Sequence, residues 1–178
     1  TLSSSSAASD VYKRQLLLFI TSSAVVATYW PVYSWDALSL FDFRGRVLFP
    51  ELGVRGLKEA YYAHYPFLTS LGHTWLYRMG AANPKLMYPL FYLSLLLGFC
   101  GCLKRECPSL LSLAWSTVLV CTPIVYRQST IAYTNLPFTF YYGLGTIYLC
   151  QWFSSRKRDS LVLSAVLLAL SLWTRPAS

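Results

Sequence analysis

Five apolar segments, separated by short or polar connectors, dominate the hydropathy pattern of this chain. They cover residues 16–33, 86–103, 108–126, 131–153 and 160–174. Each is close to the roughly 20 residues that a helix needs to cross the hydrocarbon core of a bilayer, although the last is short. The pattern therefore predicts an all-α, polytopic transmembrane bundle with about five spanning helices. It shows no internal repeat and no boundary to a soluble domain.

The connectors predict how the bundle is oriented. The segments "LKREC" (103–107) and "SSRKRD" (154–159) are short and densely basic, which is typical of cytoplasmic loops. Two helices separate them, so both can lie on one side. This arrangement places the long segment 34–85 and the connector 127–130 on the extracytoplasmic side. Basic residues also occur in 34–85, but they are spread along a much longer loop.

The long loop 34–85 carries its own helical pattern. Residues 35–49 and 57–80 mix bulky apolar and polar side chains, with a break at Pro66 in the second stretch. Both predict amphipathic helices that lie in the membrane interface. Ser34 can cap the first helix, which places Asp36 in its first turn. Asp42 and Arg46 are spaced i,i+4, which predicts an ion pair within that helix.

Two prolines fall inside expected spans. Pro123 and Pro137 lie near the predicted outer ends of their segments. A proline in a spanning helix frees backbone groups, which is tolerated where the site faces protein or a water-filled cavity. We therefore expect kinks at both positions and a polar cavity on the side of the 34–85 loop.

Composition and charge agree with a membrane protein and narrow its partners. The chain is 55% hydrophobic and 12% charged, whereas soluble domains carry about 25% charged residues. The net charge is +8, but the basic residues are scattered between apolar runs. Anionic lipid head groups or a phosphate-bearing substrate are favoured as partners, and nucleic acid is not. The five cysteines lie in or beside apolar runs and are interpreted as small apolar residues without a disulfide framework.

Several polar residues are candidates for chemistry, each with a structural alternative. Asp36 is either a general base that takes a proton from an acceptor hydroxyl or a helix acid satisfied by backbone N–H groups. Arg44 contacts either a phosphate or lipid head groups. Arg127 and Arg175, at predicted outer ends of spans, either hold a lipid-linked phosphate or snorkel to the interface. His64 and His73 lack metal-ligand spacing, so we expect structural or surface roles and no metal site.

The stretch "SSAASDVYKRQ" (5–15) near the N-terminus resembles a translated sequencing-library adapter. Residues 1–15 are therefore expected to be an artefact, and the fold is expected to begin at residue 16. The alternative is a Ser-rich leader with a basic region ahead of a signal peptide.

Four motifs carry a resemblance to a known family. They are "SWDALSLFDFRGRVLF" (34–49), "AHYPFLTSL" (63–71), "AYTNLPFTFYYGLG" (132–145) and "LALSLWTRPAS" (168–178). In order and spacing they resemble segments of bacterial membrane glycosyltransferases with the GT-C fold, related to dolichyl-phosphate-mannose–protein mannosyltransferases. The chain departs from that pattern at Asp42, Gly45, His64 and Asn135, where the family often has asparagine, alanine, an acid and aspartate.

The resemblance implies a specific activity. A sugar would pass from a polyprenyl-phosphate-linked donor to an acceptor hydroxyl at the extracytoplasmic face of the cytoplasmic membrane, with inversion. The acceptor would be a glycolipid, a polysaccharide or a protein. Asp36 would be the catalytic carboxylate, and Arg127 and Arg175 would steady the leaving phosphate, with Arg44, His64 and Asn135 as further substrate-binding candidates. The substitutions at His64 and Asn135 remove support for a second acidic residue, so no divalent metal is implied.

Enzymes of this family have more helices and a C-terminal outer domain, so we expect residues 16–178 to be an N-terminal part that is inactive alone. The rival hypothesis is a polytopic transporter or flippase component without glycosyl chemistry, and a structural membrane subunit is a third alternative.

Overall fold

The computed structural model describes residues 2–51 and 65–175, and no β-strand occurs in these two ranges. The all-α prediction is confirmed for this part of the chain. Residues 52–64, which include His64 and part of the second amphipathic segment, lie outside the described residues.

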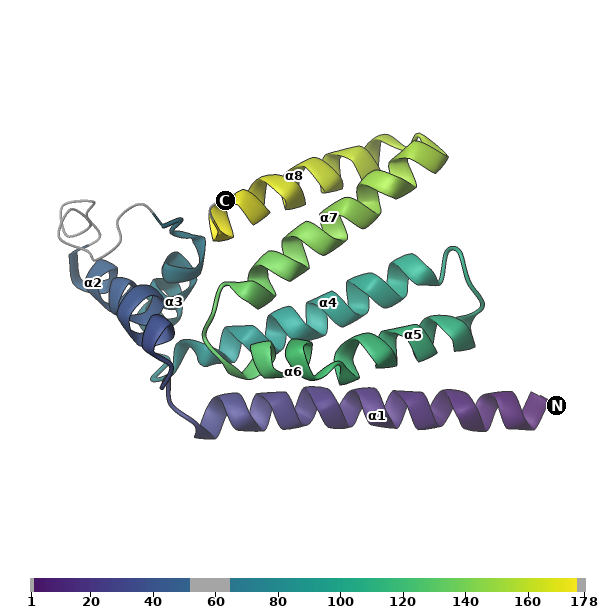
Figure 1. Ribbon diagram of the computed structural model, residues 1–178, viewed down its shortest axis with the longest axis horizontal. Helices are drawn as coiled ribbons and strands as arrows, with labels where there is room; N and C mark the ends of the chain where they lie inside the picture. The colour runs from purple at the N-terminus through teal and green to yellow at the C-terminus, as the bar shows by residue number, and fades with distance from the viewer. Residues whose placement is uncertain (1, 52–64, 176–178) are drawn as a thin grey trace.

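Five long helices form the body of the molecule (Figure 1). They are α1 (Leu2–Tyr29), α4 (Met87–Leu103), α5 (Ser109–Cys121), α7 (Asn135–Ser155) and α8 (Arg158–Thr174). Helix α8 packs on α7, α7 packs on α4, and α4 packs on α5 and α1. Each of the five apolar segments of the sequence therefore overlaps a helix of this bundle, and α1 extends back from its segment to Leu2.

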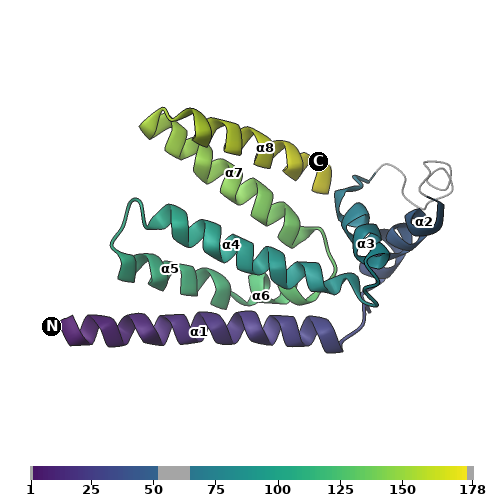
Figure 2. The ribbon, with the colours of Figure 1, turned by 180° about the vertical axis from the view of Figure 1, so that it is seen from behind.

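The connectors alternate between the two ends of the bundle (Figures 1 and 2). The turns 104–108 and 156–157 lie at one end. The described residues between 30 and 86 (30–51 and 65–86), the α6–α7 connection and Arg175 lie at the other. This is the alternation that the two basic connectors predict.

The segment between α1 and α4 folds as a group of short helices across one end of the bundle. They are the π-helical turn η1 (Ala37–Asp42), α2 (Phe43–Glu51), α3 (Leu68–Arg78) and the 3₁₀ turn η2 (Pro84–Leu86). We call η1, α2 and α3 the end cap. The helix expected over 35–49 corresponds to η1 and α2, and of the helix expected over 57–80 the described part after the break at Pro66 forms α3. The end cap contacts α8 through α3.

The two prolines act differently. Helix α5 ends at Cys121 and α6 (Pro123–Thr130) leaves it at an angle of 62°, so the break expected at Pro123 is confirmed. Proline suits the first position of a helix because its missing N–H would lack an intrahelical partner there anyway. The same reasoning applies to Pro137, which lies in the first turn of α7 and does not bend it. The kink expected at Pro137 is therefore absent.

Among the described residues, one continuous helical stretch is long and apolar enough to cross a membrane by itself. It is Pro84–Leu103, and the bent pair α5 and α6 would count as a second if it forms one span. Helix α8 has 17 residues, which corresponds to about 26 Å against the roughly 30 Å of the hydrocarbon core. The five-span arrangement stays a prediction.

Close backbone approach and polar contacts hold the bundle together. A Cβ on Gly145 would lie 2.9 Å from Leu168 Cγ and 3.2 Å from its backbone nitrogen, so glycine permits the tight α7–α8 contact. The Ser23 and Ser129 hydroxyls are 2.7 Å apart between α1 and α6. The Tyr92 hydroxyl donates to the Val120 carbonyl at 2.5 Å.

The C-terminal end of α1 is capped by side chains from the end of the loop. Lys85 Nζ donates to the Trp30 carbonyl at 2.9 Å, and Asn83 Nδ2 donates to the Ala27 carbonyl at 2.9 Å. A lysine at this position also suits the negative end of the helix dipole. These contacts fix where the end cap leaves the bundle.

Candidate functional site

Asp36 lies in the first turn of the helix that opens the end cap. The Leu38 amide donates to the Ser34 carbonyl at 2.9 Å, so the helix begins directly after Ser34, as predicted. The Asp36 side chain is exposed and makes no capping hydrogen bond to η1. Its carboxylate is therefore accessible at the end of the bundle that carries the end cap, and it does not cap the helix.

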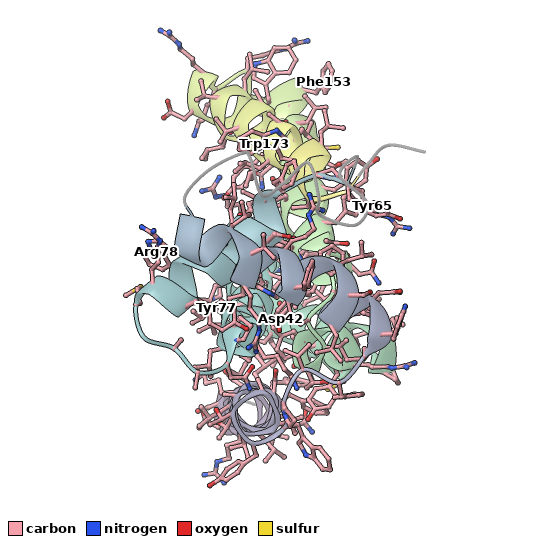
Figure 3. The ribbon with its side chains drawn as sticks, turned by 90° about the vertical axis from the view of Figure 1, so that its left-hand side faces the viewer. Asp42, Tyr65, Tyr77, Arg78, Phe153 and Trp173 are labelled. Carbon is pink, nitrogen blue, oxygen red and sulfur yellow. The ribbon has the colours of Figure 1, made fainter. Side chains whose placement is uncertain are left out.

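The second aspartate, Asp42, has the opposite environment. It is 2% exposed and its carboxylate accepts a hydrogen bond from Arg46 Nε at 2.9 Å. The predicted i,i+4 pair is confirmed. The Tyr77 hydroxyl, on α3, also donates to Asp42, and Figure 3 shows the two side chains together between η1 and α3. The Arg46 guanidinium in turn lies 5.1 Å from the centre of the Tyr77 ring.

These neighbours set the protonation of Asp42. Burial alone raises the pKa of a carboxyl group, because it disfavours the charged form. Here that effect is outweighed by His73, Tyr77 and Arg46, which together hold the pKa of Asp42 below its ordinary value of 3.8. The same contacts act on the partners. Burial and Asp42 raise the pKa of Tyr77, and the hydrogen bond to Asp42 raises the pKa of Arg46.

His73 connects Asp42 to the bundle. Its ring is fully buried, with Nδ1 3.7 Å from Asp42 Oδ1 and Nε2 3.1 Å from the hydroxyl of Tyr88 on α4. The first distance is longer than a hydrogen bond, so that contact is electrostatic. A Cβ on Gly45 would lie 2.6 Å from His73 Cβ, so a glycine is needed where α2 crosses α3. We call Asp42, Arg46, His73, Tyr77 and Tyr88 the carboxylate cluster.

Arg44 is buried inside the end cap and does not lie on its surface. Its guanidinium stacks 4.0 Å from the centre of the Phe67 ring, and Nη2 donates to the Tyr65 carbonyl at 2.9 Å. Nε and Nη1 are buried without a hydrogen-bond partner within the described ranges. Burial lowers the pKa of this arginine. In this conformation Arg44 fixes the chain that leads into α3, and the phosphate-binding role assigned to it from sequence stays a prediction.

Two residues singled out from sequence come together at the start of α7. Arg175 Nη1 donates to Asn135 Oδ1 at 3.3 Å, although the residues are 40 positions apart. Both line a cavity of about 380 Å³ between α6 and α7, which Gln128 also borders. The cavity lies at the end of the bundle that carries the end cap, where the prolines predict one. Arg127 is exposed on α6 but does not line the cavity.

A larger and mainly apolar groove of about 560 Å³ runs beneath α3. Apolar side chains of α3, α4 and α7 form most of its wall, including Leu71, Met87, Phe91 and Pro137. Thr69 and Thr174 contribute hydroxyls, and Arg78 stands at the groove from the end of α3. The groove therefore joins the end cap to the sides of the bundle helices and combines an apolar floor with a few polar groups.

The described parts of the chain contain no group of three or more His, Cys, Asp or Glu side chains that could hold a metal ion. The polar groups around the candidate site are one exposed carboxylate, the amides of Gln128 and Asn135, and arginines. Such a set suits hydrogen bonding to hydroxyls and charge pairing with a phosphate.

Sequence reasoning missed Tyr77, Tyr88 and Gln128. The first two complete the carboxylate cluster, and the last borders the small cavity. Tyr77 lies four residues after His73 in the same expected helix, so the i,i+4 spacing could have predicted that both side chains share one helix face. No sequence signal places Gln128 beside Asn135.

Comparison of the chain with protein-family models, with curated proteins and with solved structures found no match.

Proposed function

We propose that this chain is part of a membrane glycosyltransferase of the GT-C type, which transfers a sugar from a polyprenyl-phosphate-linked donor to an acceptor hydroxyl. The observation that carries the proposal is the meeting of Asn135 and Arg175 beside a cavity at the bundle end where Asp36 is exposed. The family resemblance selects these three residues from three separate motifs, and Asp36 and Arg175 are 139 positions apart in the sequence. Their gathering at one end of the fold supports a common role.

The proposed chemistry assigns one role to each group. The Asp36 carboxylate takes the proton of the acceptor hydroxyl. The hydroxyl oxygen attacks the anomeric carbon from the face opposite the phosphate, and the bond between that carbon and the phosphate oxygen breaks. The polyprenyl phosphate leaves with the bonding electrons, and the guanidinium of Arg175 stabilises its growing negative charge. Asn135 orients Arg175 through the 3.3 Å hydrogen bond.

The apolar groove beneath α3 suits the carrier lipid. Its wall of leucine, methionine and phenylalanine side chains would take an isoprenoid chain, while the polar groups near its mouth would face the phosphate. Because the groove reaches the sides of α4 and α7, the carrier would remain in the bilayer during the reaction.

The membrane arrangement is part of the proposal. The five bundle helices would span the cytoplasmic membrane, with α5 and α6 as one broken span. The basic turns 104–108 and 156–157 would be cytoplasmic, and the end cap would be extracytoplasmic. The alternation of connectors between the two ends supports this arrangement. The break at Pro123 supports a polar site at that depth, because freed backbone groups need protein or water around them.

The test is an assay on the full-length protein in proteoliposomes with a polyprenyl-phosphate sugar and a mixture of acceptors. The proposal predicts a glycosylated product that depends on Asp36 and is lost in Asp36→Asn. Asp159→Asn is the matched control, because Asp159 is an exposed acid in the first turn of a helix at the opposite end. A rival transporter or flippase would move its lipid across the bilayer without forming any glycosyl product.

A further inference from the structure

A second amphiphilic site lies at the end of the bundle opposite the end cap. The α4–α5 turn and the α7–α8 turn face each other there (Figure 2). Between them is a polar cavity of about 670 Å³, lined among others by Arg105, Glu106, Tyr148, Gln151, Lys157 and Asp159. No residue of the proposed sugar-transfer site contributes to it.

Contacts between the turns build the walls of this cavity. Arg105 Nη1 donates to Gln151 Oε1 at 3.2 Å, which ties the α4–α5 turn to α7. Arg156 has a left-handed backbone conformation, with φ of 56°, and this residue ends α7. Its guanidinium lies 5.0 Å from the centre of the Trp152 ring. The chain reversal at Arg156 brings Lys157 to the cavity wall at the start of α8.

The charge balance around the cavity favours an anion. The two turns carry five exposed cations against two exposed acids; the cations are Lys104, Arg105, Arg156, Lys157 and Arg158, and the acids are Glu106 and Asp159. Of the cations, Arg105 and Lys157 line the cavity itself. A phosphodiester carries a single negative charge that two such side chains can pair with. The two carboxylates would repel a further anionic group but accept hydrogen bonds from hydroxyls.

A second, apolar groove continues from the polar cavity. It has a volume of about 310 Å³ and lies along α4 and α7, where Phe99, Leu103 and Ile147 contribute to its wall. It shares Glu106, Gln151 and Ser154 with the polar cavity. A polar chamber that opens into an apolar groove matches an amphiphile with a charged head and an aliphatic tail.

We propose that the joined chambers bind an anionic phospholipid whose phosphodiester head group carries hydroxyls, of the phosphatidylglycerol kind. The phosphate pairs with Arg105 and Lys157. The glycerol hydroxyls donate to Glu106 and Asp159, and one acyl chain lies in the groove along α4 and α7. Trp152 flanks the head-group level, as tryptophan does at membrane interfaces. This site is independent of sugar transfer.

The test measures which lipids stay bound to the full chain. The protein is purified from mixed vesicles of phosphatidylglycerol and phosphatidylcholine, and the retained lipids are identified by native mass spectrometry. We expect phosphatidylglycerol to be enriched. The double variant Arg105→Ala/Lys157→Ala lowers its retention on the order of tenfold, because charge-assisted hydrogen bonds are lost. The matched control Lys104→Ala/Arg158→Ala removes the same charge from the same turns outside the cavity lining, and it retains the lipid.

Two further arms decide the source of the phosphate and the place of the tail. Inorganic phosphate and glycerol phosphate should not displace the lipid at equal concentration, whereas an effective displacement would identify a site for a soluble phosphate and overturn the lipid proposal. Cys150 is an exposed residue of the apolar groove, so Cys150→Trp should lower lipid retention without unfolding the protein. Equal losses in the double variant and its control would show general charge attraction and would also overturn the proposal.

Discussion

Arg175 donates a hydrogen bond to Asn135, and the bond joins the end of α8 to the first residue of α7. The two helices form an antiparallel pair whose other ends meet at the turn 156–157. The contact therefore closes the pair at the end where the end cap lies. It also holds a guanidinium at the rim of a cavity, where the bond to Asn135 limits its movement.

Removing this guanidinium should weaken binding of the phosphate-bearing donor. Arg175→Ala is expected to lower kcat/KM for the donor on the order of tenfold, because a hydrogen bond to a charged group is lost in the bound donor and in the transition state. Arg175→Lys keeps the charge and should recover part of the loss. Initial rates over a range of donor concentrations measure both effects. Because Arg175 is exposed, the thermal midpoint of both variants should match that of the wild type, and a large drop in that midpoint would assign Arg175 a structural role.

The carboxylate cluster should matter for stability. Asp42→Ala removes the acceptor of the part-buried Tyr77 hydroxyl and the carboxylate beside the buried His73 ring, and we expect a loss of about 1–3 kcal/mol in the free energy of unfolding. The control is Asp159→Ala. Asp159 is exposed in the first turn of α8, where an acid contributes less than about 1 kcal/mol through the helix dipole. Denaturant titration in detergent compares the two, and equal losses would contradict the assignment.

The same carboxylate predicts a pH dependence with a definite sign. The pKa of Asp42 is lowered in the folded state, so its contribution to stability is present above its ordinary pKa of 3.8 and is lost as the pH falls through the folded-state pKa. The difference in thermal midpoint between wild type and Asp42→Asn should be full at about pH 5 and smaller at about pH 3. A difference that grows toward pH 3 would contradict the direction of the pKa change.

The crossing of α2 and α3 should depend on the missing side chain of Gly45. Gly45→Ala places a Cβ 2.6 Å from His73 Cβ. His73 is fully buried and its Cβ is bonded directly to the backbone, so the side chain cannot move away by a change of rotamer. We expect a loss of about 1–3 kcal/mol from overpacking. Gly101→Ala in α4 is the matched control, because a Cβ there meets nothing within 4 Å and alanine favours the helix. Chemical unfolding of the two variants in parallel measures the contrast.

Local patterns in the sequence predict much of this fold. Apolar length predicts the bundle helices, the i,i+4 spacing predicts the Asp42–Arg46 pair, and Pro123 predicts the break before α6. Each of these three features depends only on residues that are close together in the sequence. The regular geometry of a helix fixes how such residues lie relative to one another. Pro137 shows the limit of this reasoning, because a proline bends a helix only beyond its first turn. The apolar pattern did not show that α7 begins at Asn135, and this start is what places Pro137 in the first turn.

The contacts between distant segments could not be predicted in the same way. Asp42 and Tyr77 are 35 positions apart, and the side of α3 that meets η1 is set by how closely Gly45 lets α2 approach. The burial of Arg44 follows from the same packing. The sequence shows an arginine in an interfacial segment, and only the fold of the end cap places its guanidinium on Phe67 instead of at the surface.

The most direct test of the central proposal is the rate of sugar transfer by the full-length protein carrying Asp36→Asn at saturating donor and acceptor. The substitution keeps the size of the side chain and removes the proton acceptor. Loss of a general base predicts a fall in kcat of about 100-fold or more, with normal membrane insertion and thermal stability. Transfer at a rate close to that of the wild type would show that Asp36 does not take the proton, and it would contradict the proposed mechanism.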